Sequence, residues 1–88
     1  PKSIVMSARE VRLSNVGDTG RLTVSNVQIR TGDTVVTGDT LLFVESKEKV
    51  IRVSAEWAGV IDAVCVCDGS QVVIDSLLAI IRSTKSGF

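Results

Sequence analysis

The chain has 88 residues, with ten Lys or Arg, ten Asp or Glu and no formal net charge at pH 7. This length is enough for one domain, and a hydrophobic fraction of 44% is that of a globular protein. The balanced charge argues against nucleic-acid binding, and no apolar run reaches the roughly 18 residues of a membrane span. With neither His nor Tyr, and no acid pair in a catalytic context, the sequence predicts a module that is not an enzyme.

The composition favours an all-β fold. Val, Ile and Thr supply 29 residues, whereas Ala and Leu together supply only 11. Side chains branched at Cβ favour strands over helices. Repeated Gly-Asp pairs divide the chain into short segments, and their spacing matches neither a P-loop nor an EF-hand. We interpret them as turns, in which Gly supplies a positive φ and Asp caps its own turn.

The predicted strands follow one another at short intervals. An alternating stretch over residues 11–16 precedes a first turn, and a strand over 20–30 is broken at Ser25-Asn26. The apolar runs 41–44 and 50–53 enclose the polar segment Glu45–Lys49. This pattern predicts a β-hairpin with an exposed tip over 46–49, at the end away from the termini, with the amines of both lysines free in solvent.

The second half of the chain repeats the first with an offset of 37 residues. Gly32 corresponds to Gly69, Asp39 to Ser76, and residues 27–30 to residues 64–67. The repeat predicts a flattened barrel-sandwich of two four-stranded antiparallel sheets with quasi-two-fold symmetry. We assign residues 1–83 to this single domain and residues 84–88 to a flexible C-terminal tail.

The apolar members of the alternating runs are the predicted core. They are Leu22, Val27, Ile29, Leu42, Val44, Ile51, Val53, Val64, Val66 and Ile80.

Several motifs, in order, resemble lipoyl domains of the biotinyl/lipoyl-attachment family. Residues 11–18 (VRLSNVGD) resemble the opening strand and first turn, and residues 30–35 (RTGDTV) a following Gly-Asp step. Residues 43–46 (FVES) resemble the strand that enters the modification hairpin. Residues 57–61 (WAGVI) and 67–72 (CDGSQV) resemble the start of the second half and its turn. The resemblance covers roughly residues 11–82.

The resemblance implies a swinging-arm carrier, in which one Lys at the hairpin tip holds lipoamide or biotin through an amide bond. Such a tether raises the concentration of the arm at successive active sites. The family places its lysine three residues after the Glu of the hairpin motif and eleven before the Gly of Ala-Gly, and both counts lead to Glu48. Lys47 and Lys49 flank it and are the candidate attachment residues, the alternative being that both only keep a charged turn solvated.

Three functions are therefore compared. The first is a lipoyl-type carrier of a 2-oxo acid dehydrogenase-like acyltransferase, or a degenerate relative, whose partners would be a lipoate-attaching enzyme and the other enzymes of the complex. The second is a non-carrier barrel-sandwich that serves as a structural or partner-docking domain and holds no cofactor. The third, part of a membrane-fusion or adaptor protein, is disfavoured because a tight tip joins the halves. Biotin is disfavoured because the family's biotin motif has Met beside its Lys, and Met6 is the only Met.

Two further features complete the prediction. Cys65 and Cys67 correspond to polar residues in the first half, so we expect exposed free thiols, a reducing compartment such as the cytoplasm, and no metal site unless another chain supplies ligands. Trp57, the only Trp, either docks a partner or covers one open end of the sandwich. We expect an isolated domain of this kind to be a monomer.

Overall fold

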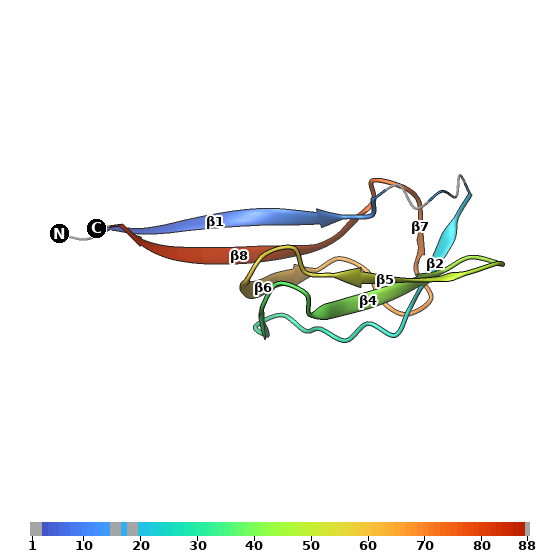
Figure 1. Ribbon diagram of the computed structural model, residues 1–88, viewed down its shortest axis with the longest axis horizontal. Coiled ribbons are helices and arrows are strands. Elements are labelled where there is room, and N and C mark those ends of the chain that lie inside the picture. Colours follow the sequence, from blue (N-terminus) through green and yellow to red (C-terminus); the bar gives the residue numbers. More distant parts are fainter. Residues whose placement is uncertain (1–2, 15–16, 18–19, 88) are drawn as a thin grey trace.

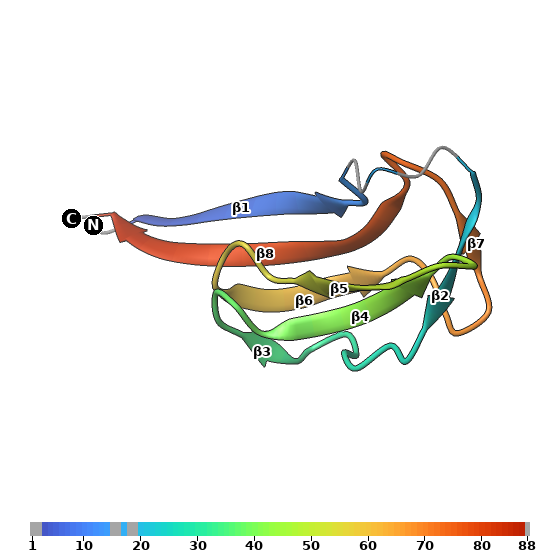
Figure 2. The same ribbon diagram turned by 45° about the vertical axis from the view of Figure 1, so that its right-hand side comes forward.

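Two four-stranded antiparallel sheets make up the computed structural model, which describes residues 3–14, 17 and 20–87. One sheet has the order β1-β8-β6-β3 and the other β5-β4-β2-β7 (Figures 1 and 2). The strands are β1 (Ser3–Arg12), β2 (Leu22–Ser25), β3 (Thr34–Val35), β4 (Thr40–Glu45), β5 (Val50–Ser54), β6 (Gly59–Val64), β7 (Gln71–Val72) and β8 (Leu77–Gly87). The predicted all-β sandwich is confirmed.

The first and last strands are longer than the sequence pattern indicated. β1 begins at Ser3, and β8 runs to Gly87 in antiparallel register with it, from Ser3 opposite Gly87 to Arg12 opposite Leu77. The predicted tail at 84–88 is therefore a strand as far as Gly87, and Phe88 lies outside the described residues. The reason is that a partner strand, not a local apolar pattern, holds this segment extended. The two strands project beyond the sandwich with both termini at their far end (Figure 1).

The middle of the chain shows one shortened strand and one confirmed hairpin. Of the strand predicted over 20–30, only β2 forms, and it ends before Asn26, whose φ of 53° breaks the extended backbone at the predicted place. Val16, in the alternation before the first turn, lies outside the described residues. β4 and β5 pair as the predicted hairpin, with Glu45 opposite Val50.

The internal repeat is visible in how its turns are closed. At each of four turns, a side-chain oxygen accepts a hydrogen bond from the backbone N–H three residues earlier. Asp33 and Ser70 do so at the first pair of corresponding turns, at 2.8 and 3.0 Å. Asp39 and Ser76 do so at the second pair, at 3.0 Å each. Because Ser replaces Asp in the second half, these turns require an acceptor oxygen and not a negative charge.

This equivalence predicts different results for two substitutions of Asp39. We expect Asp39→Ser to change the free energy of unfolding little, since Ser76 closes the corresponding turn. Asp39→Ala should lower it by about 1 kcal/mol, because the Val36 N–H loses its acceptor. Urea unfolding of both variants tests this. A Ser variant as unstable as the Ala variant would contradict the equivalence.

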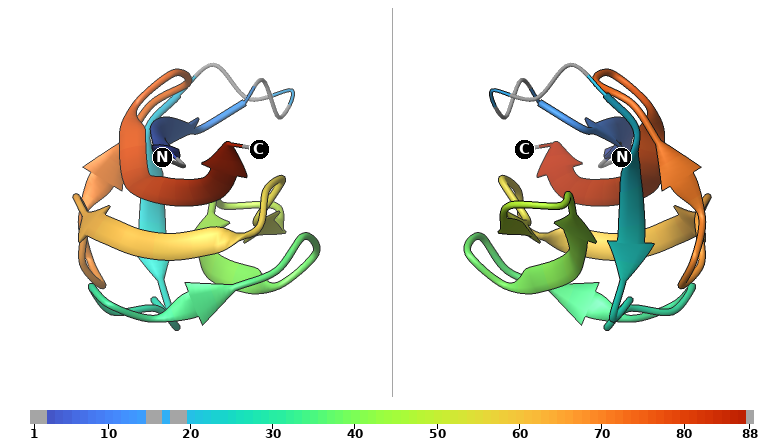
Figure 3. Two further views of the ribbon diagram at one scale, coloured as in Figure 1. Left: turned by 90° about the vertical axis from the view of Figure 1, so that its left-hand side faces the viewer. Right: turned by 90° about the vertical axis from the view of Figure 1, so that its right-hand side faces the viewer.

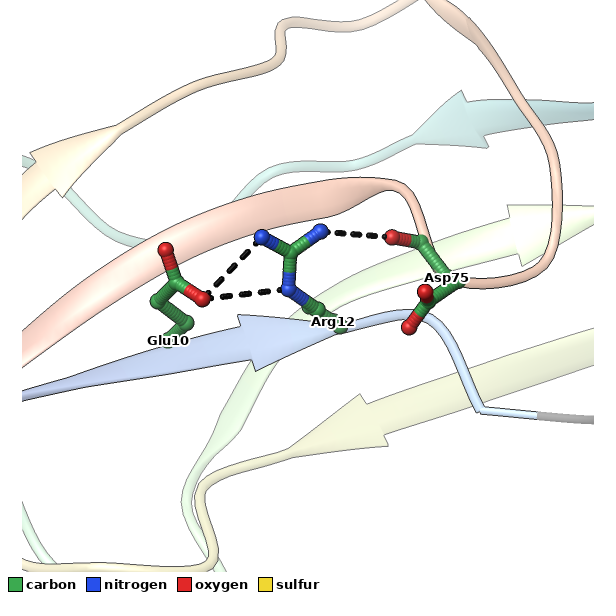
Figure 4. Close-up of polar contacts among 3 residues, drawn as sticks. All are labelled: Glu10, Arg12 and Asp75. Atoms are coloured by element: carbon green, nitrogen blue, oxygen red, sulfur yellow. Dashed lines mark hydrogen bonds and ion pairs between the residues drawn. The ribbon is translucent and has the colours of Figure 1, made fainter.

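At one pair of corresponding turns, the second half of the chain has a non-glycine residue with a positive φ. Gly38 has a φ of 96°, and Asp75, its counterpart, has a φ of 74°. The Asp75 carbonyl oxygen accepts a hydrogen bond from Arg12 Nη1 at 2.9 Å, while Arg12 Nη2 and Nε lie 3.0 and 3.1 Å from Glu10 Oε1 (Figure 4). Arg12 thereby ties the end of β1 to the turn before β8. The ion pair itself is half-exposed, so it adds little stability.

The core lies between the two sheets. In the end-on views the strands of both sheets curve around this central region (Figure 3). Of the ten predicted core residues, four are buried, six are partly exposed and none is fully exposed. Ile81, not Ile80, is completely buried in β8. The buried apolar residues are Val11, Leu13, Leu22, Val24, Ile29, Val35, Leu41, Leu42, Val44, Ala55, Ile61, Val72, Leu78, Ala79 and Ile81.

Trp57 lies in the connection between β5 and β6. Its side chain is half-buried and packs against the core. Arg9 of β1 covers the ring, with the guanidinium carbon 5.2 Å from the ring centroid, within the range of a cation–π contact. These contacts hold Trp57 against the core and against β1.

Candidate functional site

The candidate site is the tip of the β4–β5 hairpin. After the Glu45–Val50 pair, the Ser46 N–H donates to the Lys49 carbonyl oxygen at 2.9 Å and closes a four-residue turn. The Ser46 hydroxyl accepts hydrogen bonds from the N–H groups of Glu48 at 3.3 Å and Lys49 at 3.2 Å. Lys47 and Glu48 are therefore the two central residues of the turn, and Ser46 fixes its shape.

The tip projects into solvent from a well-anchored base. Val44 is completely buried at the end of β4, whereas Lys47, Glu48 and Lys49 are all exposed. In Figures 1 and 2 the hairpin ends at the side of the molecule away from both termini. The predicted exposed turn at this end is thus confirmed. Val50 is 63% exposed, an apolar side chain next to the charged tip.

The two lysines differ, which the sequence did not indicate. The Lys49 ammonium lies beside Gly17, where an added Cβ would stand 3.5 Å from Lys49 Nζ. Lys49 is exposed but has an interaction partner, so it is not free as the sequence predicted. The reason is that the turn directs Lys49 back toward the segment before β2. Lys47 instead lies at the apex of the turn. It borders a shallow hollow, whose other lining residues are Gly20, Arg21, Ser46 and Glu48.

Gly17, Gly20 and Arg21 are neighbours of the tip that the sequence did not predict. The Arg21 guanidinium donates to Gln71 Oε1 at 3.2 Å, which holds it at the start of β2. Some 25 residues separate this segment from the hairpin, and no periodic pattern links them. The segment and the hairpin tip come together only because the strands of the sheet pair as they do.

The chemistry available at the tip is that of a solvent-exposed primary amine. The chain has no His, and the tip is open, so nothing there excludes water from a reaction. Among residues 3–14, 17 and 20–87, no group of three or more potential ligands of the Cys, Asp and Glu types is gathered for a metal ion. An amine on a rigid hairpin is suited to acylation by a separate enzyme.

Comparisons with known proteins agree with this geometry. A family model described as "Biotin-requiring enzyme", that of the biotin/lipoyl family, matches residues 9–81. Among solved structures, the lipoyl domain of the 2-oxoglutarate dehydrogenase complex from Azotobacter vinelandii is similar, with a TM-score of 0.66 and 21% sequence identity. That match covers 90% of this chain and 98% of the other. A comparison with curated proteins gave no match.

The two-sheet fold is that of a lipoyl domain, and the matching family model is that of biotin- and lipoyl-attachment domains. The chain belongs to the biotin/lipoyl attachment family. The part of the chain that the structure describes contains no helix able to cross a membrane.

Proposed function

We propose that this domain is a lipoyl-type swinging-arm carrier of a 2-oxo acid dehydrogenase-like acyltransferase, with its arm attached to Lys47. The single observation that supports this assignment is the position of Lys47 as an exposed central residue of the turn that Ser46 closes. The family membership and the likeness to a lipoyl domain of a 2-oxoglutarate dehydrogenase complex support the class of carrier. Lipoyl is favoured over biotin because no Met adjoins the tip lysines.

The residues of the tip fit an amide-linked group. Lys47 would supply the nitrogen of the amide bond, and its exposed position at the apex would leave it accessible to an enzyme that attaches the group. When bound, the group supplies the carrier chemistry, and the protein supplies position and reach. Ser46 would keep the turn in one shape through its two hydrogen bonds, so that the amine is presented at a fixed place. Partners would be the attaching enzyme and the other enzymes of a multienzyme complex.

Intact mass after co-expression with an active lipoate ligase tests this function. We expect the wild-type chain to gain one lipoyl group, Lys47→Arg to gain none, and Lys49→Arg to be modified like the wild type. Arg keeps the charge of each lysine but cannot form the amide, so the two variants are matched. Modification of Lys47→Arg, or loss of modification only in Lys49→Arg, would contradict the assignment to Lys47.

One observation favours a second candidate function, a non-carrier module that docks a partner. Glu48 occupies the second central position of the turn, and counting along the sequence places the family's lysine at this residue. A Glu48→Lys variant separates the two functions. Modification of this variant but not of the wild type would show a carrier scaffold without its attachment residue. If neither the wild type nor Glu48→Lys is modified, while a known lipoyl domain is modified under the same conditions, the chain is neither a carrier nor a carrier scaffold that lacks only its lysine.

A further inference from the structure

Cys65 and Cys67 lie on a short segment whose two ends are separately anchored. Past the end of β6, the Cys65 N–H donates to the Leu78 carbonyl oxygen at 2.9 Å and so continues the pairing with β8. At the other end, the Cys67 N–H donates to Ser70 Oγ at 3.0 Å, and the Cys67 carbonyl oxygen accepts from the Ser70 N–H at 2.9 Å. The backbone of both cysteines is therefore held in place.

Alternation along the segment places the two cysteines on the same side, and Cys67 Sγ lies 3.5 Å from Ser70 Oγ, within hydrogen-bond range. Val66, between them, is partly buried and packs against the core, so the side chains before and after it face outward. Both cysteines are exposed, and neither forms a disulfide, as the sequence predicted. Alternate Cα atoms of an extended chain lie roughly 6.5–7 Å apart. This exceeds the usual disulfide separation of about 5.5–6 Å, so the parallel thiols do not favour an S–S bond.

A metal ion between the sulfurs relaxes this distance requirement. With metal–thiolate bonds of about 2.3 Å, two sulfurs on opposite sides of one ion stand about 4.6 Å apart. Because both Cys side chains are exposed, rotation about χ1 can bring the sulfurs to this spacing without moving the backbone, at the loss of the contact between Cys67 Sγ and Ser70 Oγ. The anchored segment thus presents a two-thiolate site.

The number of ligands near the thiols indicates which metal ion the site could bind. A structural zinc site needs four ligands, and the described residues offer no cluster of three. The adjacent carboxylate of Asp68 is oriented by a hydrogen bond that its Oδ1 accepts from the Val27 N–H at 2.8 Å. Soft thiolates prefer Cu(I), which is stable with two ligands. A two-coordinate ion would need no ligand from another chain, and in this respect the proposal departs from the sequence prediction.

We propose that Cys65 and Cys67 form a two-coordinate binding site for Cu(I), separate from the hairpin tip. Binding converts both thiols to thiolates and releases two protons, with no change in the oxidation state of copper or sulfur. Affinity should therefore rise with pH. The site requires a reducing compartment, which is also the location expected from two exposed thiols.

An anaerobic titration with Cu(I) against the chelator bathocuproine disulfonate tests this site. We expect one Cu(I) per chain, with both thiols protected from alkylation, and no saturable binding of Zn(II) added as a probe. Cys65→Ser and Cys67→Ser should each weaken binding by at least the roughly 100-fold that changes around metal ligands can reach. Asp68→Asn, which keeps an acceptor for the Val27 N–H, should bind like the wild type.

Three results would overturn the proposal. One is unchanged Cu(I) affinity in either single Cys variant, and another is weakened binding in Asp68→Asn. The third is one Cu(I) per two chains with a doubled mass in sedimentation, since that would mean bridging between molecules. Because both cysteines are exposed, the Ser variants should fold like the wild type, which circular dichroism checks.

Discussion

Gly59→Ala is expected to destabilise the domain by about 3 kcal/mol, because the added methyl group has no space. A Cβ at this position would overlap the backbone carbonyl oxygen of Arg82 and stand 2.8 Å from Ile81 Cγ2. Gly59 opens β6 between β3 and β8, with Val35 opposite it in the ladder and Arg82 opposite the next residue. The overlapping atom belongs to the backbone of the neighbouring strand, so relief requires the two strands to separate.

Gly20→Ala is the matched control for this effect. Among the residues that the structure describes, no atom lies within 4 Å of a Cβ at Gly20, and the φ of Gly20 is not in the left-handed region. We expect its free energy of unfolding in urea to stay within about 0.5 kcal/mol of the wild type. Equal stability of the Gly59→Ala and Gly20→Ala variants would contradict the close packing of β6 against β8. Adding Ile81→Ala to Gly59→Ala should not rescue stability, since the Arg82 oxygen remains.

Ile81→Ala is expected to cost about 2–5 kcal/mol through the cavity it leaves between the sheets. Ile81 is completely buried, whereas its neighbour Ile80 is partly exposed. Ile80→Ala removes the same atoms from a site that water already reaches, so it should cost clearly less. A domain of this size is typically stable by only about 4–13 kcal/mol, so Ile81→Ala leaves a small margin.

Thermal or urea unfolding of the two variants decides between the neighbouring positions. Should Ile81→Ala fail to fold, Ile81→Val remains measurable and should cost about 0.5–1.5 kcal/mol. A larger loss at Ile80 than at Ile81 would show that β8 presents its other face to the core.

The fold class and the tip were predictable because their signals are local. β-Branched residues, alternating polarity and Gly-Asp turns each act over a few residues, and the 37-residue repeat carries the same signals twice. The charged run after Val44 indicated a solvated turn, since these charges could not be buried unpaired without a large desolvation cost. These inferences do not depend on which strands pair.

Other features were decided by tertiary structure, since they join residues far apart in the chain. β1 and β8 are long because each supplies the hydrogen bonds that the other lacks, although neither segment shows a strong pattern over its outer half. Ile81 instead of Ile80 is completely buried in a strand whose register shifts against both neighbours, between Val11 and Arg12 and between Ile61 and Ala63. Lys49 lies beside Gly17 because pairing of the strands places two distant turns together. Local polarity indicates where turns and strands lie, but only the packed sheets decide which of two neighbouring apolar residues is buried and which distant residues come into contact.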